Sequence, residues 1–415
     1  MSKRKANMNF EKKRWRLLFT GMIIELCAGL PYSWSVFQNL LAEKYQWSTI
    51  GTAGAYSFAS ICMLVFSLLA AGPLMKRLGL RPFLFAGGVI YALGTLGCGM
   101  IRGDIWELYL FYGVCIGVGT AILYPTLTSY AVRLFPDHPG LASGVMVGGY
   151  GCGPFVIAPL LAAIYEMTGD ISQAFLLLGG LFAVIILPLS ISLCEPPLNW
   201  EIKKGGATHT SGTSHLSKQF TRKEMLKSGT FYLLYITFAI AVTSGTMLIT
   251  QASPILQDNF NMEVAAAAGI VGGLSLSNTL GRLLWGGVSD RIGKSGSLLA
   301  VHALMLAGFF MLLTHQLALC VLALLLCIFC FGGASTLLAP STAEYFGAST
   351  LKENYTVMFS IFSVAGIGGP MLLTNFGYRN AFLFGAAGAV LGLITAVLLH
   401  MKHPAPKQAA PGPIK

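Results

Sequence analysis

The chain has 415 residues, of which 55% are hydrophobic and only 10% are charged, whereas soluble domains carry roughly 25% charged residues. A soluble fold cannot bury so much apolar surface, so the composition predicts an integral membrane protein built from α-helices. The formal net charge of +11 does not indicate a nucleic-acid partner, because the basic residues gather in alternate loops between apolar segments.

Twelve apolar segments are long enough to cross the ~30 Å hydrocarbon core of a bilayer, which takes about 20 helical residues. The first segment follows a basic stretch and shows no small-residue cleavage site, so we expect a retained helix rather than a signal peptide. The predicted spans are 16–42, 48–75, 82–102, 105–133, 139–165, 171–196, 228–256, 264–289, 295–316, 318–345, 354–376 and 379–401.

Lysine and arginine are distributed unevenly between the two sides of these spans. If the N-terminus is cytoplasmic, the inner segments hold 23 of the 27 basic residues and the outer loops hold three, Lys44, Arg102 and Arg379. This bias is the positive-inside pattern, and it predicts that both termini lie in the cytoplasm and that the protein sits in the cell (inner) membrane. The one basic residue left over is Arg282, which lies inside a span.

A polar segment rich in Gly, Ser, Thr and Lys divides the chain into two sets of six spans. We expect an N-terminal six-helix bundle at 1–198, a cytoplasmic linker at 199–227 and a C-terminal six-helix bundle at 228–415. Part of the linker, LSKQFTRKEMLK, has the composition of an amphipathic surface helix.

The two halves resemble each other at a nearly constant offset. GPLMKRLGLR and GGVSDRIGK begin 214 residues apart, Pro125 and Pro340 lie 215 apart, and Pro154 and Pro370 lie 216 apart. Matches that drift so little indicate an internal duplication, which is common in transporters.

The loop after the second span of the C-terminal half reads G-x-x-x-D-R-x-G-K, and with the six-plus-six organisation it resembles the major facilitator superfamily. The resemblance implies a gating motif at Gly286, Asp290, Arg291 and Gly293. The N-terminal copy departs from the motif, because Lys76 stands where the acidic residue is expected.

A narrower resemblance, to the oxalate/formate antiporter family and its monocarboxylate transporter relatives, covers most of the chain. It rests on the stretches CAGLPYSWSVF (27–37), FYLLYITFAIAVTSGTM (231–247), SNTLGRLLWGGVSDRIG (277–293), STAEYFG (341–347) and NYTVMFSIFSVAGIGGP (354–370). The resemblance implies that the cargo is a small organic acid.

Arg282 lies about eight residues from the charged end of its span, or ~12 Å below the surface at a rise of ~1.5 Å per residue. A charge at the bilayer centre costs about 2.5–3.5 kcal/mol on insertion scales. We therefore expect Arg282 to face a cavity and to bind a carboxylate through its planar fork of donors. Asn278, one turn earlier on the same face, is expected beside it.

The resemblance agrees with this role and shows two departures. It implies that an arginine at the position of Arg282 holds the substrate carboxylate. Monocarboxylate transporters pair that arginine with an aspartate one turn earlier, where this chain has Asn278. Oxalate carriers are expected to place a lysine in the eleventh span, where this chain has Phe362. One cation favours a substrate with one carboxylate, with Phe359 and Phe362 as an apolar wall.

Other positions are weaker candidates. Glu25 lies at a depth similar to Arg282 and could pair with it or take up a proton, or it could pack as a neutral, protonated acid. His302 is a second candidate for proton coupling, but a satisfied core histidine is the favoured interpretation there. The remaining substrate-contact candidates are Tyr124, Leu30 and Tyr32, the last beside Pro31 in a first span that the proline loosens.

We found no phosphate-binding glycine loop and no catalytic motif, so no enzyme activity or cofactor is expected. The one close cysteine pair, Cys327-x-x-Cys330, lies inside an apolar span, where we expect packing rather than a metal site. The sequence predicts a monomeric secondary transporter with alternating access in a lipid bilayer. The preferred cargo is a short monocarboxylate, lactate or pyruvate, moved together with a proton. The alternative is an antiporter that exchanges dicarboxylate for monocarboxylate, as oxalate/formate carriers do.

Overall fold

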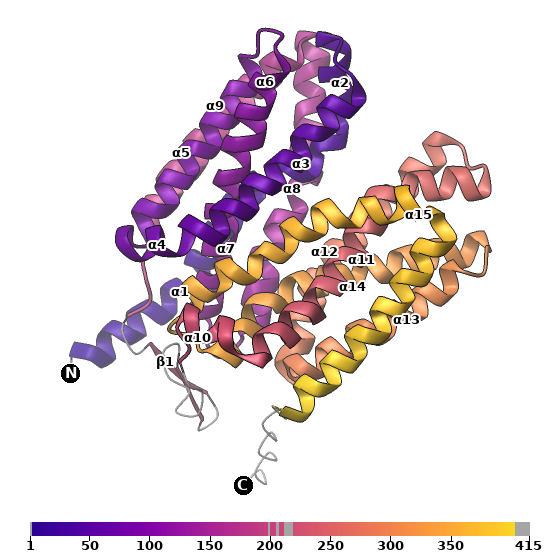
Figure 1. Ribbon diagram of the computed structural model, residues 1–415. Coiled ribbons are helices and arrows are strands. Elements are labelled where there is room, and N and C mark those ends of the chain that lie inside the picture. Colours follow the sequence, from indigo (N-terminus) through magenta and orange to yellow (C-terminus); the bar gives the residue numbers. More distant parts are fainter. Residues whose placement is uncertain (1, 198–199, 205–206, 211–218, 403–415) are drawn as a thin grey trace.

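The computed structural model describes residues 2–197, 200–204, 207–210 and 219–402. The chain forms two helical bundles that meet at one end of the molecule and diverge toward the other (Figure 1). The end where they meet also holds β1, α10, the start of α1 and the end of α15. We call it the linker side, and the opposite end the far side.

The first bundle begins with a broken helix and ends at residue 192. Its elements are α1 (Ser2–Ala28), the 3₁₀ turn η1 (Leu30–Ser33), α2 (Trp34–Tyr45), α3 (Thr49–Phe66), the π-helical turn η2 (Ser67–Ala71), α4 (Gly72–Leu78), α5 (Leu80–Gly99), α6 (Ile105–Leu108), the π-helical segment η3 (Tyr109–Ile116), α7 (Gly117–Leu134), α8 (Pro139–Thr168) and α9 (Ile171–Ser192).

The second bundle follows the linker. Its elements are α11 (Gly229–Phe260), α12 (Val264–Ile292), α13 (Lys294–Leu312), α14 (Leu317–Phe346) and α15 (Leu351–Lys402). α15 contains both the eleventh and the twelfth predicted spans, which join at Gly377, where φ is 74°. Glycine tolerates this left-handed conformation, so the chain reverses without a longer loop.

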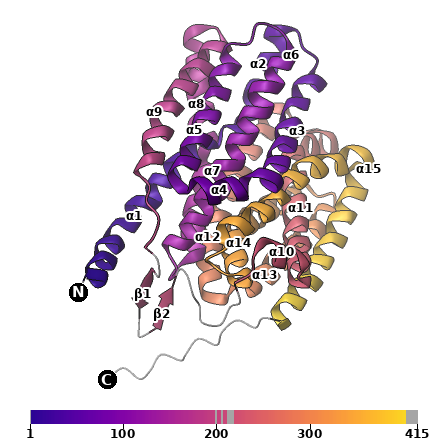
Figure 2. The same cartoon turned by 60° about the vertical axis from the view of Figure 1, so that its left-hand side comes forward.

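The linker is more ordered than its composition suggested. Its described residues include a two-stranded antiparallel hairpin, β1 (Glu201–Lys204) and β2 (Ala207–Thr210), which projects from the linker side (Figure 2). The predicted amphipathic helix corresponds in part to the short α10 (Arg222–Lys227). Thr221 and Glu224 cap its first turn reciprocally, which explains why the helix begins there.

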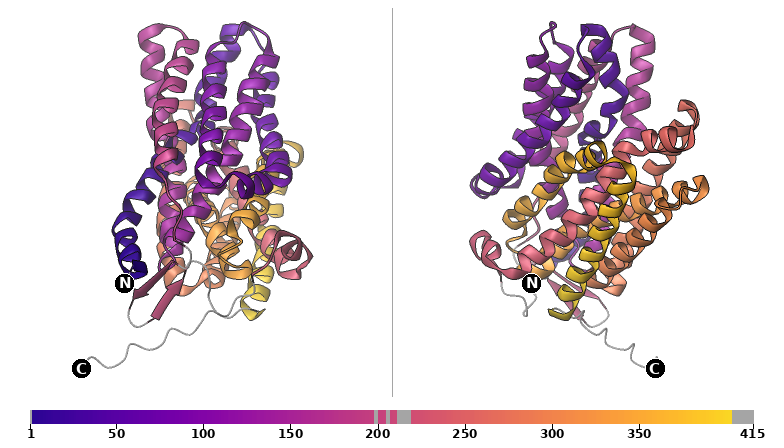
Figure 3. Two further views of the ribbon diagram at one scale, coloured as in Figure 1. Left: turned by 90° about the vertical axis from the view of Figure 1, so that its left-hand side faces the viewer. Right: turned by 45° about the vertical axis from the view of Figure 1, so that its right-hand side comes forward.

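Ten helical runs in the described residues are long and apolar enough to cross a membrane. The two other predicted spans correspond to α1 with η1 and α2, and to α12. Each half has its own large cluster of buried apolar side chains. Further views show the two bundles stacked obliquely (Figure 3). The duplicated prolines fall on matched helices, Pro125 inside α7 and Pro340 inside α14.

Candidate functional site

Arg282 lies where α12 packs against α8, and its side chain is fully buried. Its Nη1 donates to the carbonyl of Val147 at 2.8 Å, its Nε to Asn278 Oδ1 at 3.2 Å, and its Nη2 to the Tyr32 hydroxyl at 3.3 Å. Within the described residues no carboxylate forms an ion pair with it. The guanidinium is therefore held by neutral acceptors.

Glycines on the neighbouring helices create the space for this side chain. A methyl group on Gly151 of α8 would lie 3.0 Å from Arg282 Nε, and one on Gly332 of α14 would lie 2.2 Å from the Asn278 carbonyl. The Thr336 hydroxyl donates to the Arg282 carbonyl at 3.0 Å, which ties α14 to the same turn. Close helix approach, which small residues permit, thus fixes the arginine in place.

A cavity of about 640 Å³ lies between the two bundles on the far side of Arg282. Its walls come from η1 and η3, the first halves of α2, α7 and α12, the middles of α3 and α8, the second half of α11, one residue of α14, and the part of α15 before Gly377. Charged side chains are absent from its described lining, which is aromatic and polar. Lining members include Tyr32, Gln38, Tyr56, Tyr112, Thr120, Tyr124, Tyr150, Gln251, Ser275, Asn278, Phe359 and Phe362.

Tyr32 stands between Arg282 and the cavity. Arg282 itself is not part of the lining, whereas Tyr32 and Asn278 are. The Arg282 guanidinium carbon lies 5.6 Å from the centre of the Tyr32 ring. We expected Arg282 to face a cavity; in this conformation it lies directly behind the cavity floor, and Tyr32 covers it.

The aromatic residues predicted for the site come together in one wall. Tyr124 stacks on Phe359 with ring centres 4.8 Å apart and contacts Phe362 at 5.9 Å. Tyr150 joins Tyr124 to Tyr32 through edge contacts at 4.9 and 5.0 Å. All five side chains line the cavity. Leu30, in contrast, is buried and does not line it.

The break in the first span explains how Tyr32 reaches this position. Pro31 lies in the first turn of η1, which replaces the α-helix between α1 and α2. Gly29 allows the close approach that the break requires, because a methyl group there would lie 2.5 Å from the Tyr150 carbonyl. The chain thus turns toward α8 just before Tyr32.

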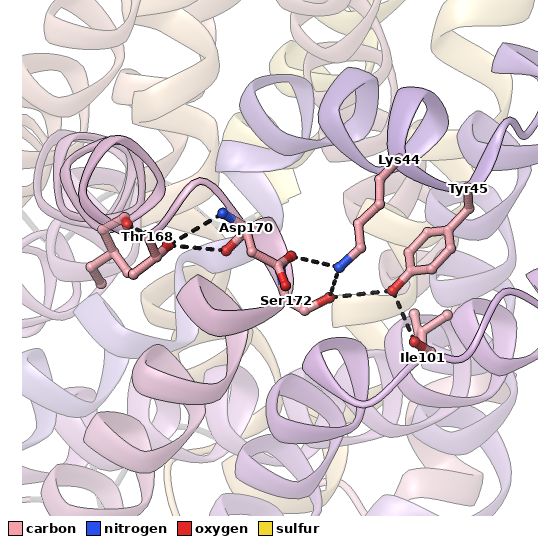
Figure 4. A network of polar contacts seen from close by, with 7 residues as sticks. Lys44, Tyr45, Ile101, Thr168, Asp170 and Ser172 are labelled. Atoms are coloured by element: carbon pink, nitrogen blue, oxygen red, sulfur yellow. Dashed lines mark hydrogen bonds and ion pairs between the residues drawn. The ribbon is translucent and has the colours of Figure 1, made fainter.

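The far-side end of α2 is anchored to the start of α9. Figure 4 shows Lys44 Nζ donating to Asp170 at 2.5 Å and to the Ser172 hydroxyl at 2.6 Å, while Tyr45 donates to the Ile101 carbonyl at 2.8 Å. The hydrogen bond from Lys44 holds the pKa of Asp170 below its usual value. Partial burial lowers the pKa of Lys44, but the contacts with Asp170 and Tyr45 together outweigh it and raise the pKa above its usual value.

The two proton-coupling candidates differ in their surroundings. Glu25 on α1 is fully buried, and no described residue lies within hydrogen-bond distance of either carboxyl oxygen. It lies within electrostatic range of Arg282. His302 on α13 is buried elsewhere, with its ring nitrogens 2.9 and 3.1 Å from the carbonyls of Leu298 and Thr237, and it does not line the cavity. Of the two candidates, Glu25 is therefore the one within electrostatic range of the arginine.

The gating motif closes the linker side of the same helix pair. Asp290 accepts hydrogen bonds from the backbone amides of Gly140 and Leu141, both at 2.9 Å, and from Lys294 at 2.6 Å. A methyl group on Gly286 would lie 2.4 Å from the Gly140 carbonyl. Gly293 turns the chain with φ 82°, and the Arg291 side chain is exposed. The motif joins the start of α8 to the end of α12, and so one half to the other.

The duplicated position in the first half is built differently. Lys76 on α4 lies 3.5 Å from Glu353, in the first turn of α15. The acidic residue that the motif lacks on α4 is thus present on the partner helix. Because Lys76 replaces the acidic residue of the motif, the salt bridge that the motif's acid would form is absent here. The structure shows an ion pair with the charges exchanged, in which Lys76 supplies the positive charge and Glu353 the negative one.

A second set of contacts joins the halves on the linker side. Glu195 receives a hydrogen bond from Lys352 of the C-terminal half and lies 3.7 Å from Arg133. Burial raises the pKa of Glu195, but Lys352 and Arg133 together hold it below its usual value. Arg222 of α10 donates to the Leu68 carbonyl in η2.

Sequence reasoning did not identify Trp34, Tyr112 and Thr120 as substrate-contact candidates. All three line the cavity, and the Trp34 Nε1, Tyr112 hydroxyl and Thr120 hydroxyl are buried without a described hydrogen-bond partner. Buried polar atoms without partners are rare in proteins, so these groups mark a surface suited to a polar ligand or water.

Comparison with known proteins agrees with this architecture. The sequence profile of the Major Facilitator Superfamily matches residues 17–370. The oxalate:formate antiporter of Oxalobacter formigenes is 26% identical over 414 residues, covering 96% of this chain and 95% of that protein. Monocarboxylate transporter 12 of Mus musculus is 23% identical over 410 residues, covering 91% and 82%.

Solved structures show the same fold. The structure of the transporter FucP in the outward conformation superimposes with a TM-score of 0.70 at 15% identity, covering 92% of this chain and 98% of that one. The predicted all-α membrane fold and the predicted superfamily are confirmed. The chain therefore belongs to the Major Facilitator Superfamily and is a membrane-spanning transporter rather than an enzyme.

Proposed function

We propose that the protein is a secondary active transporter that moves a short monocarboxylate, such as lactate or pyruvate, together with a proton. The observation that carries this proposal is the state of Arg282: a fully buried cation beside the central cavity, held only by neutral acceptors among the described residues. A buried guanidinium without a counter-charge is a strong site for an organic anion.

The cavity lining favours one carboxylate over two. Phe362 lines the cavity at the position where oxalate carriers are expected to place a lysine, and no described lining residue is charged. An anion with a second carboxylate would leave that charge against aromatic rings and hydroxyl groups. Tyr124, Phe359 and Phe362 instead suit a short carbon chain.

Access to Arg282 requires a rearrangement. The substrate carboxylate reaches Nη2 only when the Tyr32 hydroxyl moves away from it. The carboxylate then replaces one neutral acceptor by a charge-assisted, paired contact. We propose that Asn278, Tyr124 and the ring of Tyr32 make the further substrate contacts, and that Leu30 supports the turn from beneath.

We infer that the linker side is cytoplasmic, because 23 of the 27 basic residues lie in segments that it would hold. The protein would then be a monomer in the cell (inner) membrane with both termini inside. In that orientation the cavity opens outward, and the contacts of Asp290, Lys76 and Glu195 form the closed inner gate of an alternating-access cycle.

Uptake of radiolabelled L-lactate and pyruvate into liposomes tests the proposal. With an inward proton gradient and no internal substrate, we expect uptake that a proton ionophore abolishes. Arg282→Ala should abolish it, whereas Arg379→Ala, which removes an exposed arginine, should not. Uptake that Arg282→Ala leaves intact would refute the assigned anion site.

The second candidate is obligatory exchange of organic anions, favoured by the similarity to the oxalate:formate antiporter over 96% of this chain. It predicts no uptake of label until the liposomes are preloaded with formate or another acid. The same preparation therefore separates the two functions.

A further inference from the structure

Glu25 is a carboxyl group whose surroundings do not match a structural role. It is fully buried in α1, and no described side chain or backbone group donates a hydrogen bond to either oxygen. An ionised carboxylate left unpaired in an apolar interior is very costly. Glu25 therefore carries its proton in this conformation.

The groups that face Glu25 come from four helices. Arg282 on α12 is the positive charge acting on it. Tyr91 on α5, Tyr124 on α7 and Tyr355 on α15 are the other titratable groups within range. Of the remaining helices that pack on α1, α9 holds no charged residue and α8 holds only Glu166, near its far-side end.

Asn278, the residue beside Arg282, is neutral, so an acid from another helix can balance the guanidinium charge. Asn278 accepts from Arg282 Nε at 3.2 Å but contributes no charge. The guanidinium charge is therefore not balanced from its own helix. Glu25 supplies a carboxyl group from the opposite half of the molecule, so its distance from Arg282 changes when the two halves move.

We propose that Glu25 carries the transported proton and alternates with the substrate carboxylate as the counter-charge of Arg282. This inference rests on the proposed proton symport. In the conformation described here, Glu25 is neutral and Arg282 has no counter-charge among the described residues, so it attracts the substrate anion, which reaches it once Tyr32 moves away. Tyr124, which lines the cavity and lies within range of Glu25, marks the route by which a proton reaches the carboxyl group.

Release follows when the linker side opens. Water then reaches α1, Glu25 gives its proton to water, and its carboxylate pairs with Arg282 while the substrate carboxylate leaves. One negative charge replaces another at the guanidinium, so each cycle moves one proton with one monocarboxylate. The empty carrier returns with Glu25 ionised and paired with Arg282, so the proton is not carried back, and Glu25 is protonated again only from the far side.

The test compares Glu25→Gln with the wild type in two assays on the same liposomes. Glutamine keeps the size and neutrality of the protonated side chain. We expect it to retain exchange of labelled lactate for internal lactate and to lose accumulation driven by a proton gradient. His302→Gln is the matched control and should retain both activities, because His302 is remote from Arg282.

The outcomes separate this inference from the proposed function. Full proton-driven accumulation by Glu25→Gln overturns the role of Glu25 and leaves symport standing. A wild type that never accumulates lactate overturns symport, and the role of Glu25 with it. If Glu25→Gln is unstable, Glu25→Asp is measured instead. The pH at which lactate accumulation is half-maximal should shift in this variant. The rate of lactate exchange at saturating proton concentration should stay the same.

Discussion

The carboxylate of Asp290 caps the first turn of α8, with its two oxygens 2.9 Å from the amides of Gly140 and Leu141. The first amides of a helix have no partner within it, and the helix dipole favours a negative charge there. Asp290 belongs to α12, so this cap joins the two halves. Its side chain is only 9% exposed, which protects the contact from solvent.

We predict that Asp290→Asn loosens the linker-side closure. The amide keeps one acceptor but loses the charge, which should cost about 1 kcal/mol. Ser143 donates to the Thr336 carbonyl across the same closure, so a cysteine at position 143, in a chain without native cysteines, reports on its opening. Maleimide should label it faster in Asp290→Asn than in the parent chain.

Glu263→Gln is the control for this measurement, because it neutralises an exposed acid at the other end of α12. Equal labelling in Asp290→Asn and Glu263→Gln would show that the cap does not hold the halves together.

Tyr32→Phe should strengthen substrate binding and lower the stability of the substrate-free protein. Loss of the hydroxyl leaves Arg282 Nη2 without its 3.3 Å acceptor, and an unsatisfied buried donor costs about 1–3 kcal/mol. Bound carboxylate restores a partner, so the substrate dissociation constant should fall about tenfold for each 1.4 kcal/mol. Thermal unfolding with and without lactate measures both effects.

Tyr56→Phe provides the comparison, since Tyr56 lines the cavity and has no contact with Arg282 shown by the structure. If Tyr32→Phe binds lactate no better than Tyr56→Phe does, the hydroxyl does not compete with substrate.

The Lys44–Asp170 contact should make stability fall in acid. The folded pKa of Asp170 lies below its ordinary value of 3.8, so the contact is fully present above that value and is lost as the pH falls through the lowered pKa. At high pH the raised pKa of Lys44 keeps the contact intact beyond the usual range for lysine.

Asp170→Asn should therefore unfold at a lower temperature than the wild type near neutral pH, and the difference should shrink below pH 3.8. The exposure of both side chains keeps the effect modest. A difference that stays constant down to the acid limit would show that the charge of Asp170 does not contribute.

Local sequence patterns predict much of this architecture. Apolar segments of membrane-spanning length predict the helices, and the offset between Pro125 and Pro340 predicts the matched helices that carry them. The four-residue spacing of Asn278 and Arg282 predicts their contact, which the structure shows. Such features depend only on helical periodicity and bilayer thickness.

The rest depends on contacts between distant residues. Tyr32 and Arg282 lie 250 residues apart, and their meeting requires both the break at η1 and the glycines of α8. The departure at Lys76 indicated a missing acid, yet its partner, Glu353, belongs to the other half of the chain. Local pattern gives no information on such pairs, because they are fixed by how two bundles pack.

The two copies of the duplicated loop differ in how strongly dissolved salt affects their contacts. Lys76 is 73% exposed, so its attraction to Glu353 lies within reach of dissolved ions, which screen charges over about 8–10 Å at physiological salt. Asp290 and its amides are shielded from those ions. A rise in ionic strength should therefore weaken the Lys76–Glu353 attraction and leave the contacts of Asp290 unchanged. Although the two loops are copies of one repeat, the two sides of the gate then open with different ease.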